Sequence, residues 1–270
     1  MVVQHNLSAM NTNRQLGITT AGQAKSTEKL SSGYRINRAG DDAAGLTISE
    51  KMRSQIRGLN KASTNAEDGI SLIQVAEGAL NEAHSILQRM NELATQAAND
   101  TNTSSDRTAI QQEIDALTSE IDRIASTTQF NTMNLINGSF KEKNLQVGAL
   151  QGQKITVSIS TMNATALSIN ALKVSSFEKA GSAMTKIQHA ISKVSTQRSA
   201  LGALQNRLEH TVANLDTTAE NTQSAESRIR DVDMANEMVE YSKNNILAQA
   251  GQSMLAQANQ STQGVLSILG

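Results

Sequence analysis

The 270-residue chain contains no cysteine, no proline and no tryptophan, and it has only two tyrosines and three phenylalanines. Without cysteine there can be no disulfide, zinc–thiolate site or catalytic thiol. Proline removes a backbone N–H donor and blocks the helix interior, so its absence over this length indicates long continuous helices. Large aromatic rings usually anchor a globular core, and their scarcity disfavours a compact α/β enzyme.

An excess of one charge is also missing, because 24 Lys and Arg residues balance 25 Asp and Glu residues. This balance argues against binding to nucleic acid or to an anionic membrane surface, since both need clustered positive charge. No stretch approaches about 18 uninterrupted apolar residues, so we predict no membrane insertion. Residues 1–6 do not resemble an ordinary signal peptide, which predicts a chain that is cytosolic or exported without a cleavable signal.

Apolar residues at heptad spacing dominate the first half of the chain. The clearest seam alternates steps of four and three residues over 72–97, which is typical of a coiled coil and predicts a helix from about Arg57. A second apolar stripe lies beside this seam, so the apolar face of the helix is wide enough to pack against two partner helices. The polar stretch 99–106 ends the helix, and a second seam over 110–124 predicts an antiparallel neighbour.

The pattern changes between about 130 and 175. Apolar and polar residues alternate over 155–159, which predicts a strand with one buried face. Leu145 and Val147 can supply the other arm of a β-hairpin near 140–160. The predicted fold class is therefore mainly α: a long antiparallel helical rod or coiled coil with one small β-hairpin.

Three further helices are expected, of which two lie at the ends of the chain. Ser175 and Glu178 have the spacing of a capping box, and a third long seam follows over 187–215. Segments 1–36 and 234–269 repeat the heptad spacing with thin apolar cover and several polar seam positions. Isolated helices without packing are marginal, so these two ends should pair with each other and with other copies.

Three methionines of the last segment have two interpretations. Met234, Met238 and Met254 fit best as seam or core residues. The alternative is an exposed surface that accommodates more than one partner, for which the flexible thioether is well suited.

Few residues could support catalysis. The histidines have no H-E-x-x-H or E-x-x-H spacing and are interpreted as solvated helix-surface residues: His5, His84, His189 and His210. Asp41 and Asp42 are adjacent carboxylates between glycines, and we expect them to cap or bend the chain. No phosphate-binding glycine loop occurs. We therefore predict a protein that is not an enzyme and that has no cofactor and no metal site.

Seven segments carry a resemblance that extends over nearly the whole chain: 29–46 (KLSSGYRINRAGDDAAGL), 68–74, 128–131, 205–209, 225–231, 245–250 and 254–259. In these segments the chain resembles bacterial flagellin. The resemblance implies paired terminal helices, 1–42 with 226–270, that form the coiled-coil core of a filament. It also implies a rod domain over 43–225 and a connecting spoke around 33–45. Too few residues lie between the rod helices for an outer variable domain.

The resemblance also implies three groups of site residues. A contact with the flagellin-sensing Toll-like receptor is expected at Gln88, Arg89, Leu93, Ile110 and Glu113. Charge pairs between subunits are expected in the spoke, at Arg35, Asn37, Arg38, Asp41 and Asp42. Contacts with an export chaperone and within the filament core are expected at Ile246, Leu247, Met254, Leu255, Val265 and Leu266. One departure is Asn91, where many flagellins that alert animal immunity carry a second arginine.

The function implied is that of a secreted, extracellular structural subunit that polymerises into the flagellar filament for swimming. Its expected partners are other copies of itself, the export chaperone, the flagellar secretion apparatus, and the filament cap and junction proteins. The alternative is a hook–filament junction protein of the same superfamily. An enzymatic flagellin would need a metal-binding histidine pair and an inserted protease domain, and the sequence has neither.

Overall fold

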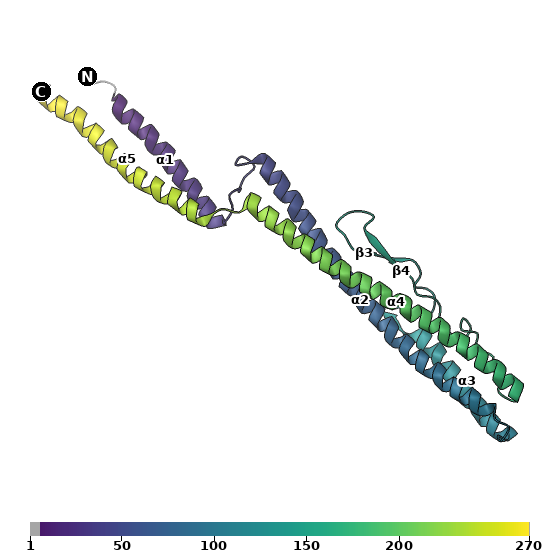
Figure 1. Ribbon diagram of the computed structural model, residues 1–270. Coiled ribbons are helices and arrows are strands. Elements are labelled where there is room, and N and C mark those ends of the chain that lie inside the picture. The colour runs from purple at the N-terminus through teal and green to yellow at the C-terminus, as the bar shows by residue number, and fades with distance from the viewer. Residues whose placement is uncertain (1–5, 270) are drawn as a thin grey trace. The chain divides into compact units, whose positions relative to one another are not determined.

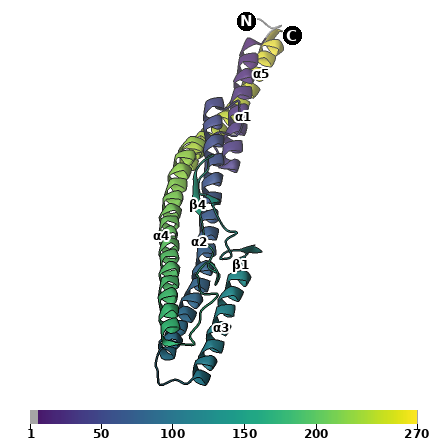
Figure 2. The same cartoon turned by 90° about the vertical axis from the view of Figure 1, so that its right-hand side faces the viewer.

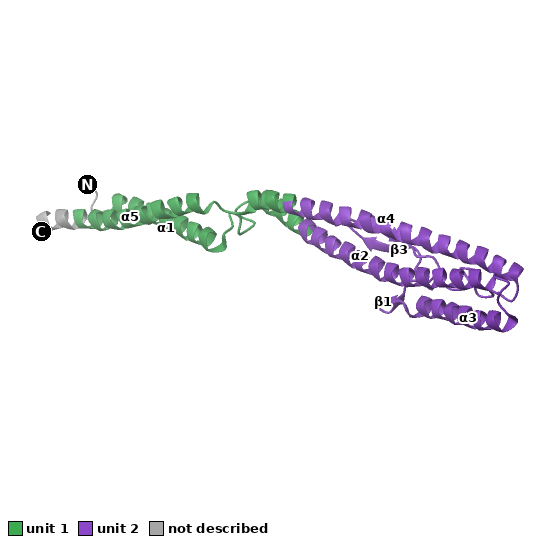
Figure 3. Cartoon of the chain, turned by 60° about the horizontal axis from the view of Figure 1, so that its bottom comes forward, with its two compact units in different colours: residues 1–54, 221–270 green, residues 55–220 purple. Residues whose placement is uncertain are grey.

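The computed structural model describes the backbone of residues 6–269 and the side chains of residues 6–261. Over that range the chain forms five helices (Figure 1): α1 Leu7–Ser32, α2 Ala43–Ala97, α3 Ser104–Thr127, α4 Phe177–Arg230 and α5 Met234–Leu269. The chain divides into two compact units, residues 1–54 with 221–270 and residues 55–220, which Figure 3 shows in green and purple. We call the first the terminal unit and the second the rod unit.

The core of the rod unit lies along α2. Ile73, Leu80, Leu87 and Ala94 recur every seven residues and are fully buried, and the neighbouring stripe that includes Met90 is buried as well. The apolar face is thus wide enough to pack against both α3 and α4, which lie on different sides of α2 in Figure 2. This confirms the predicted helical rod. Helix α2 begins well before Arg57, because Asp42 caps its first turn.

Two helix starts have well-defined caps, and only one of them was predicted. The polar link after α2 ends in a capping box, in which the Thr103 hydroxyl accepts from the Asp106 amide and the Asp106 carboxylate accepts from the Thr103 amide. The capping box expected at Ser175 is wrong by one residue. Helix α4 begins at Phe177, and Ser176 Oγ accepts from the Lys179 amide at 3.4 Å. The third helical position is thus a lysine, which cannot return the hydrogen bond.

The predicted β-hairpin is present in the rod unit. Strand β3 (Lys143–Gln146) pairs antiparallel with β4 (Lys154–Val157), and Leu145 lies opposite Ile155. Ile155 and Val157 are buried while the residues between them are exposed, as alternation requires. A tight approach fixes the hairpin to α2, because a Cβ atom on Gly69 would lie 2.4 Å from Leu145 Cδ1.

A second strand pair was not predicted. Strand β1 (Gln129–Phe130) pairs with β2 (Met133–Asn134) across a tight turn at Asn131 and Thr132. Both turn residues have positive φ, 46° and 63°. Asparagine tolerates this region and threonine does not favour it, so the turn had no glycine to signal it.

In the terminal unit α1 and α5 run antiparallel. Gly22 of α1 lies against Asn244, and the Asn6 side chain donates to the carbonyl of Ala258 at 3.0 Å. Packing is thin: among the described side chains of the two helices, Ser26 and Ala248 are the buried ones. Most large apolar residues of both helices are therefore exposed in the single chain.

Candidate functional site

The groups that could support catalysis lie apart. Among the described residues no cluster of three or more His, Cys, Asp or Glu side chains could hold a metal ion. His189 and His210 are exposed, as expected, and His5 lies outside the described residues. The prediction is wrong for His84, which is half-buried with Nε2 at 3.0 Å from the Gln88 amide nitrogen. The contact with Gln88, one turn later on α2, holds the His84 ring against the side of the helix.

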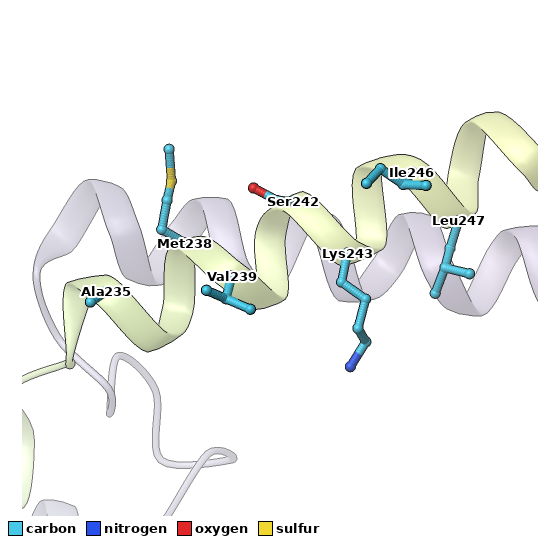
Figure 4. A pocket seen from close by; sticks show the side chains of 7 residues that line it. All are labelled: Ala235, Met238, Val239, Ser242, Lys243, Ile246 and Leu247. Carbon is cyan, nitrogen blue, oxygen red and sulfur yellow. The ribbon is translucent and has the colours of Figure 1, made fainter.

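One candidate binding surface is an apolar groove along the first half of α5. Figure 4 shows its lining: Ala235, Met238, Val239, Ser242, Lys243, Ile246 and Leu247. Val239 and Ile246 lie seven residues apart, on one face of the helix, and are about two-thirds exposed. Exposed apolar faces of this kind are typical of interaction sites.

The structure places part of the expected chaperone and filament-core set in this groove. Ile246 and Leu247 line it and are 66% and 48% exposed, and Met254 is exposed further along α5. Leu255 is half-buried. The side chains of Val265 and Leu266 lie outside the described residues. Sequence reasoning missed Val239, although its heptad spacing from Ile246 could have indicated it.

The methionines of α5 also lie on the surface. Met234, Met238 and Met254 are 51%, 54% and 58% exposed. The favoured interpretation was seam or core residues, and in the single chain the core part of it is wrong. The thin α1–α5 packing covers too little of either helix to bury them.

The spoke segment uses its carboxylates inside the chain. The Asp41 carboxylate forms an ion pair with the Lys25 ammonium at 2.9 Å. It also accepts hydrogen bonds from the backbone amides of Asn37 and Arg38 at 3.2 and 3.1 Å. These hydrogen bonds, that of Lys25 above all, lower the pKa of Asp41 from 3.8 to about 2. Asp42 accepts from the Gly45 amide at 2.8 Å and so caps α2. The prediction that Asp41 and Asp42 cap or bend the chain agrees with these contacts.

The remaining spoke residues also have partners within the terminal unit. Arg38 pairs with Glu28 at 3.0 Å, and the Asn37 side chain donates to the Tyr34 carbonyl. The Arg35 guanidinium donates to the Ile229 carbonyl at the end of α4. Pairing of these groups between subunits stays a prediction, and it would have to compete with bonds that the single chain already makes.

The residues of the expected receptor contact come together on α2 and α3. Arg89 pairs with Glu113 across the two helices at 3.0 Å and with Glu92 along its own helix at 3.2 Å. Gln88 is exposed beside them. Leu93 and Ile110 are only 2% and 7% exposed, so neither offers the surface contact expected of it. The heptad seam explains this, because Leu93 belongs to the stripe that α2 buries.

These surfaces define a class of protein rather than an active site. A well-packed helical rod joins two terminal helices whose apolar faces are exposed, which is the design of a subunit that completes its packing by association. In the described residues no helix has the length and apolar character needed to cross a membrane.

Comparison with known proteins identifies the family. Residues 3–141 match the bacterial flagellin N-terminal helical region, and residues 184–269 match the C-terminal helical region. The chain is 55% identical to the flagellin of Halalkalibacterium halodurans over 271 residues, and 52% identical to the flagellin of Bacillus subtilis. Both comparisons cover the whole of each chain. The chain belongs to the bacterial flagellin family, the structural subunits of the extracellular flagellar filament.

Solved structures agree with this assignment. The crystal structure of Bacillus cereus flagellin has a TM-score of 0.52 and 31% identity, covering 60% of this chain and 94% of that one. A putative flagellar hook-associated protein from Vibrio parahaemolyticus has a TM-score of 0.60 at 12% identity and covers 71% of this chain and all of that one, which shows a shared fold only. Full-length identity to flagellins confirms the expected family, and the near-equal lengths fit a short flagellin.

Proposed function

We propose that this flagellin polymerises through its terminal helices, and that the apolar groove of α5 is one of the surfaces by which copies meet. The observation that carries the proposal is that large apolar side chains are exposed on regular, well-formed helices. Ile18 of α1 and Val239 and Ile246 of α5 are 61–67% exposed, although both helices are regular. Covering such side chains stabilises an assembly by about 25 cal/mol for each Å² of apolar surface removed from water.

Seeded polymerisation tests the groove. The double variant Val239→Ser, Ile246→Ser removes apolar surface from the groove and leaves the buried residues of the chain in place. We expect this variant to elongate filament seeds far more slowly than the wild type, measured by light scattering and electron microscopy. The matched control is Leu150→Ser, because Leu150 is 68% exposed but lies on the hairpin loop of the rod unit. Normal elongation by the groove variant would show that the groove is not an assembly surface.

We further propose that the same end of the chain binds a cytosolic export chaperone before passage through the secretion apparatus. Exposed apolar helices in the cell invite premature association, and a helix-in-groove complex would cover them. Calorimetry should show binding that is lost when residues 230–270 are removed and kept when residues 1–30 are removed. Equal binding after both truncations would exclude this site.

Contact with the flagellin-sensing Toll-like receptor is also proposed, through Gln88, Arg89 and Glu113 at the α2–α3 surface. Arg89→Ala should weaken binding of the monomer to the receptor ectodomain. Arg123→Ala is the matched control, since Arg123 is also an exposed arginine paired with a glutamate, Glu120. Equal affinities for the two variants would make Arg89 a structural residue. Contacts with the filament cap and junction proteins, and the absence of catalytic activity, complete the proposed role.

A further inference from the structure

The terminal unit contains a cluster of contacts at the point where the chain crosses twice between helices. One crossing, residues 33–42, joins α1 to α2, and the other, residues 231–233, joins α4 to α5. The two crossings pair like strands: Tyr34 and Asp231 form an antiparallel bridge. The Arg35 amide donates to the Arg230 carbonyl at 2.7 Å, and the Val232 amide donates to the Gly33 carbonyl at 3.0 Å. Two connections far apart in sequence are thus joined by backbone hydrogen bonds.

Arg230 braces this bridge with its side chain. The guanidinium Nη1 donates to Glu50 Oε1 on α2 at 2.8 Å, and the guanidinium carbon lies 4.8 Å from the centre of the Tyr34 ring. One side chain at the end of α4 therefore contacts both the first crossing and the start of α2. A planar cation suits this position, because a guanidinium stacks on an aromatic ring and still donates at its edge.

Arg230 is half-buried, whereas its neighbour Arg228 is exposed. Its side chain is 13% exposed, whereas the carboxylate partner Glu50 is 50% exposed. Its Nε is buried and has no hydrogen-bond partner among the described residues. A partly buried charge is retained at some cost in desolvation, and one established use of such a group is to fix a single arrangement of the chain. The pKa of Glu50 lies below its ordinary value, chiefly because Arg230 donates to it.

We propose that Arg230 is a positioning residue for filament assembly: it locks the two crossings together and so fixes how the α1–α5 pair leaves the ends of α2 and α4. This inference depends on the proposed polymerisation through the terminal helices. An interface that repeats in every subunit needs one geometry, and a loosened crossing would present the α1–α5 pair in many orientations. Ordering those orientations during assembly would cost conformational entropy.

The test compares full-length wild type with Arg230→Ala, Arg230→Lys and Tyr34→Leu. The matched control is Arg228→Ala, because Arg228 is exposed and its contact is with Ser224 Oγ at 3.4 Å. Circular dichroism reports the helices of the monomer. Hydrogen exchange at the Arg35 and Val232 amides reports the bridge directly. NMR titration of Glu50 reports its pairing with Arg230, and Arg53, which contacts the same carboxylate at 3.2 Å, is left in place. Seeded elongation and filament pitch, measured by electron microscopy, report assembly.

We expect Arg230→Ala to keep its helix content, to exchange both bridge amides about tenfold faster or more, and to raise the pKa of Glu50. Its filaments should elongate more slowly or have an altered or irregular pitch. Arg230→Lys should be intermediate, since lysine keeps the charge but not the planar stacking. Arg228→Ala should match the wild type in every measurement.

Two results would overturn the inference. Unchanged bridge exchange in Arg230→Ala would show that the side chain does not brace the crossings. Faster exchange with wild-type elongation and pitch would show that the brace does not control assembly. If Arg230→Ala lost its helices, Tyr34→Leu would decide, because it removes only the ring stacking at a 39% exposed residue. Failure of the wild type itself to polymerise would count against the proposed function instead.

Discussion

The rod unit and the terminal unit are both built mainly of long helices, but they bury the apolar faces of those helices to different extents. In the rod unit, α2 places isoleucine, leucine and alanine at 0% exposure every seven residues from Ile73 to Ala94. In the terminal unit, Ile18 of α1 and Ile246 of α5 are 61% and 66% exposed. Heptad spacing alone therefore does not decide what a helix does. The number of apolar partners within the same chain decides whether a stripe becomes core or remains a surface.

This difference indicates where the free energy of each unit comes from. Burial of apolar side chains stabilises the rod unit within one chain. The terminal helices have little of this term, and isolated helices without packing are marginal. We infer that the rod folds in the monomer and that the terminal helices gain most of their stability in the polymer.

Removing both ends of the chain should have the largest effect. A fragment without residues 1–42 and 226–270 keeps the buried stripe of α2 and its partners on α3 and α4. We expect a helical, cooperatively melting monomer that does not elongate seeds at all, measured by circular dichroism and light scattering. An unfolded fragment would show that the rod needs the terminal unit, and filaments from the fragment would show that assembly does not.

A matched pair of isoleucines measures the contrast at single residues. Ile73→Ala deletes a fully buried side chain and should lower the free energy of unfolding of the monomer by about 2–5 kcal/mol. Ile246→Ala makes the same chemical change at a 66% exposed position and should cost about 0.5 kcal/mol or less. Denaturant titration of the monomers checks both values. Similar losses at the two sites would mean that the α5 groove is packed in the single chain.

The same comparison can be made with glycines of α2 within the rod unit. Alanine gains about 1 kcal/mol over glycine in a helix interior. At Gly78 the added Cβ meets nothing within 4 Å, so Gly78→Ala should raise the stability by about 0.5–1 kcal/mol. At Gly69 the Cβ would lie 2.4 Å from Leu145 Cδ1, and overpacking of about 1–3 kcal/mol should cancel the gain or exceed it. Equal melting temperatures for the two variants would show that the hairpin yields freely.

The sequence predicted the rod well, because heptad spacing reports directly on burial between helices. The sequence was a less reliable guide where a single residue sets the start of a helix or the position of a turn. The cap of α4 is Ser176 rather than Ser175, and the β1–β2 turn at Asn131 and Thr132 has no glycine. Spacing also could not distinguish a buried stripe from an exposed one, so Met238 was expected as a seam or core residue but is 54% exposed. For Leu93 the spacing was right, and the surface contact implied by the resemblance was wrong.

The contacts of the crossings could not be predicted for a different reason. Tyr34, Glu50 and Arg230 lie on three segments that are distant in the sequence, and no motif links them. Their meeting depends on the backbone bridge between Tyr34 and Asp231, which involves single residues rather than a strand pattern. The family resemblance covered these residues, but it did not indicate which side chains contact one another.

The smallest expected effect concerns pH and lies in the spoke. The pKa of Asp41 falls from 3.8 to about 2 on folding, because Lys25 and two backbone amides bind its ionised form. A carboxylate whose pKa is lowered by folding stabilises the folded state at pH values above its unfolded-state pKa. This contribution disappears as the pH falls from 3.8 to about 2. NMR titration of the monomer should therefore give Asp41 a midpoint near 2. Lys25→Met should move that midpoint upward while leaving the helix content unchanged. The Lys25 side chain is 57% exposed, so salt should weaken the shift. A midpoint of 3.8 in the wild type would show that the Lys25–Asp41 pair does not form in solution, and that the spoke carboxylate is free to pair with a neighbouring subunit instead.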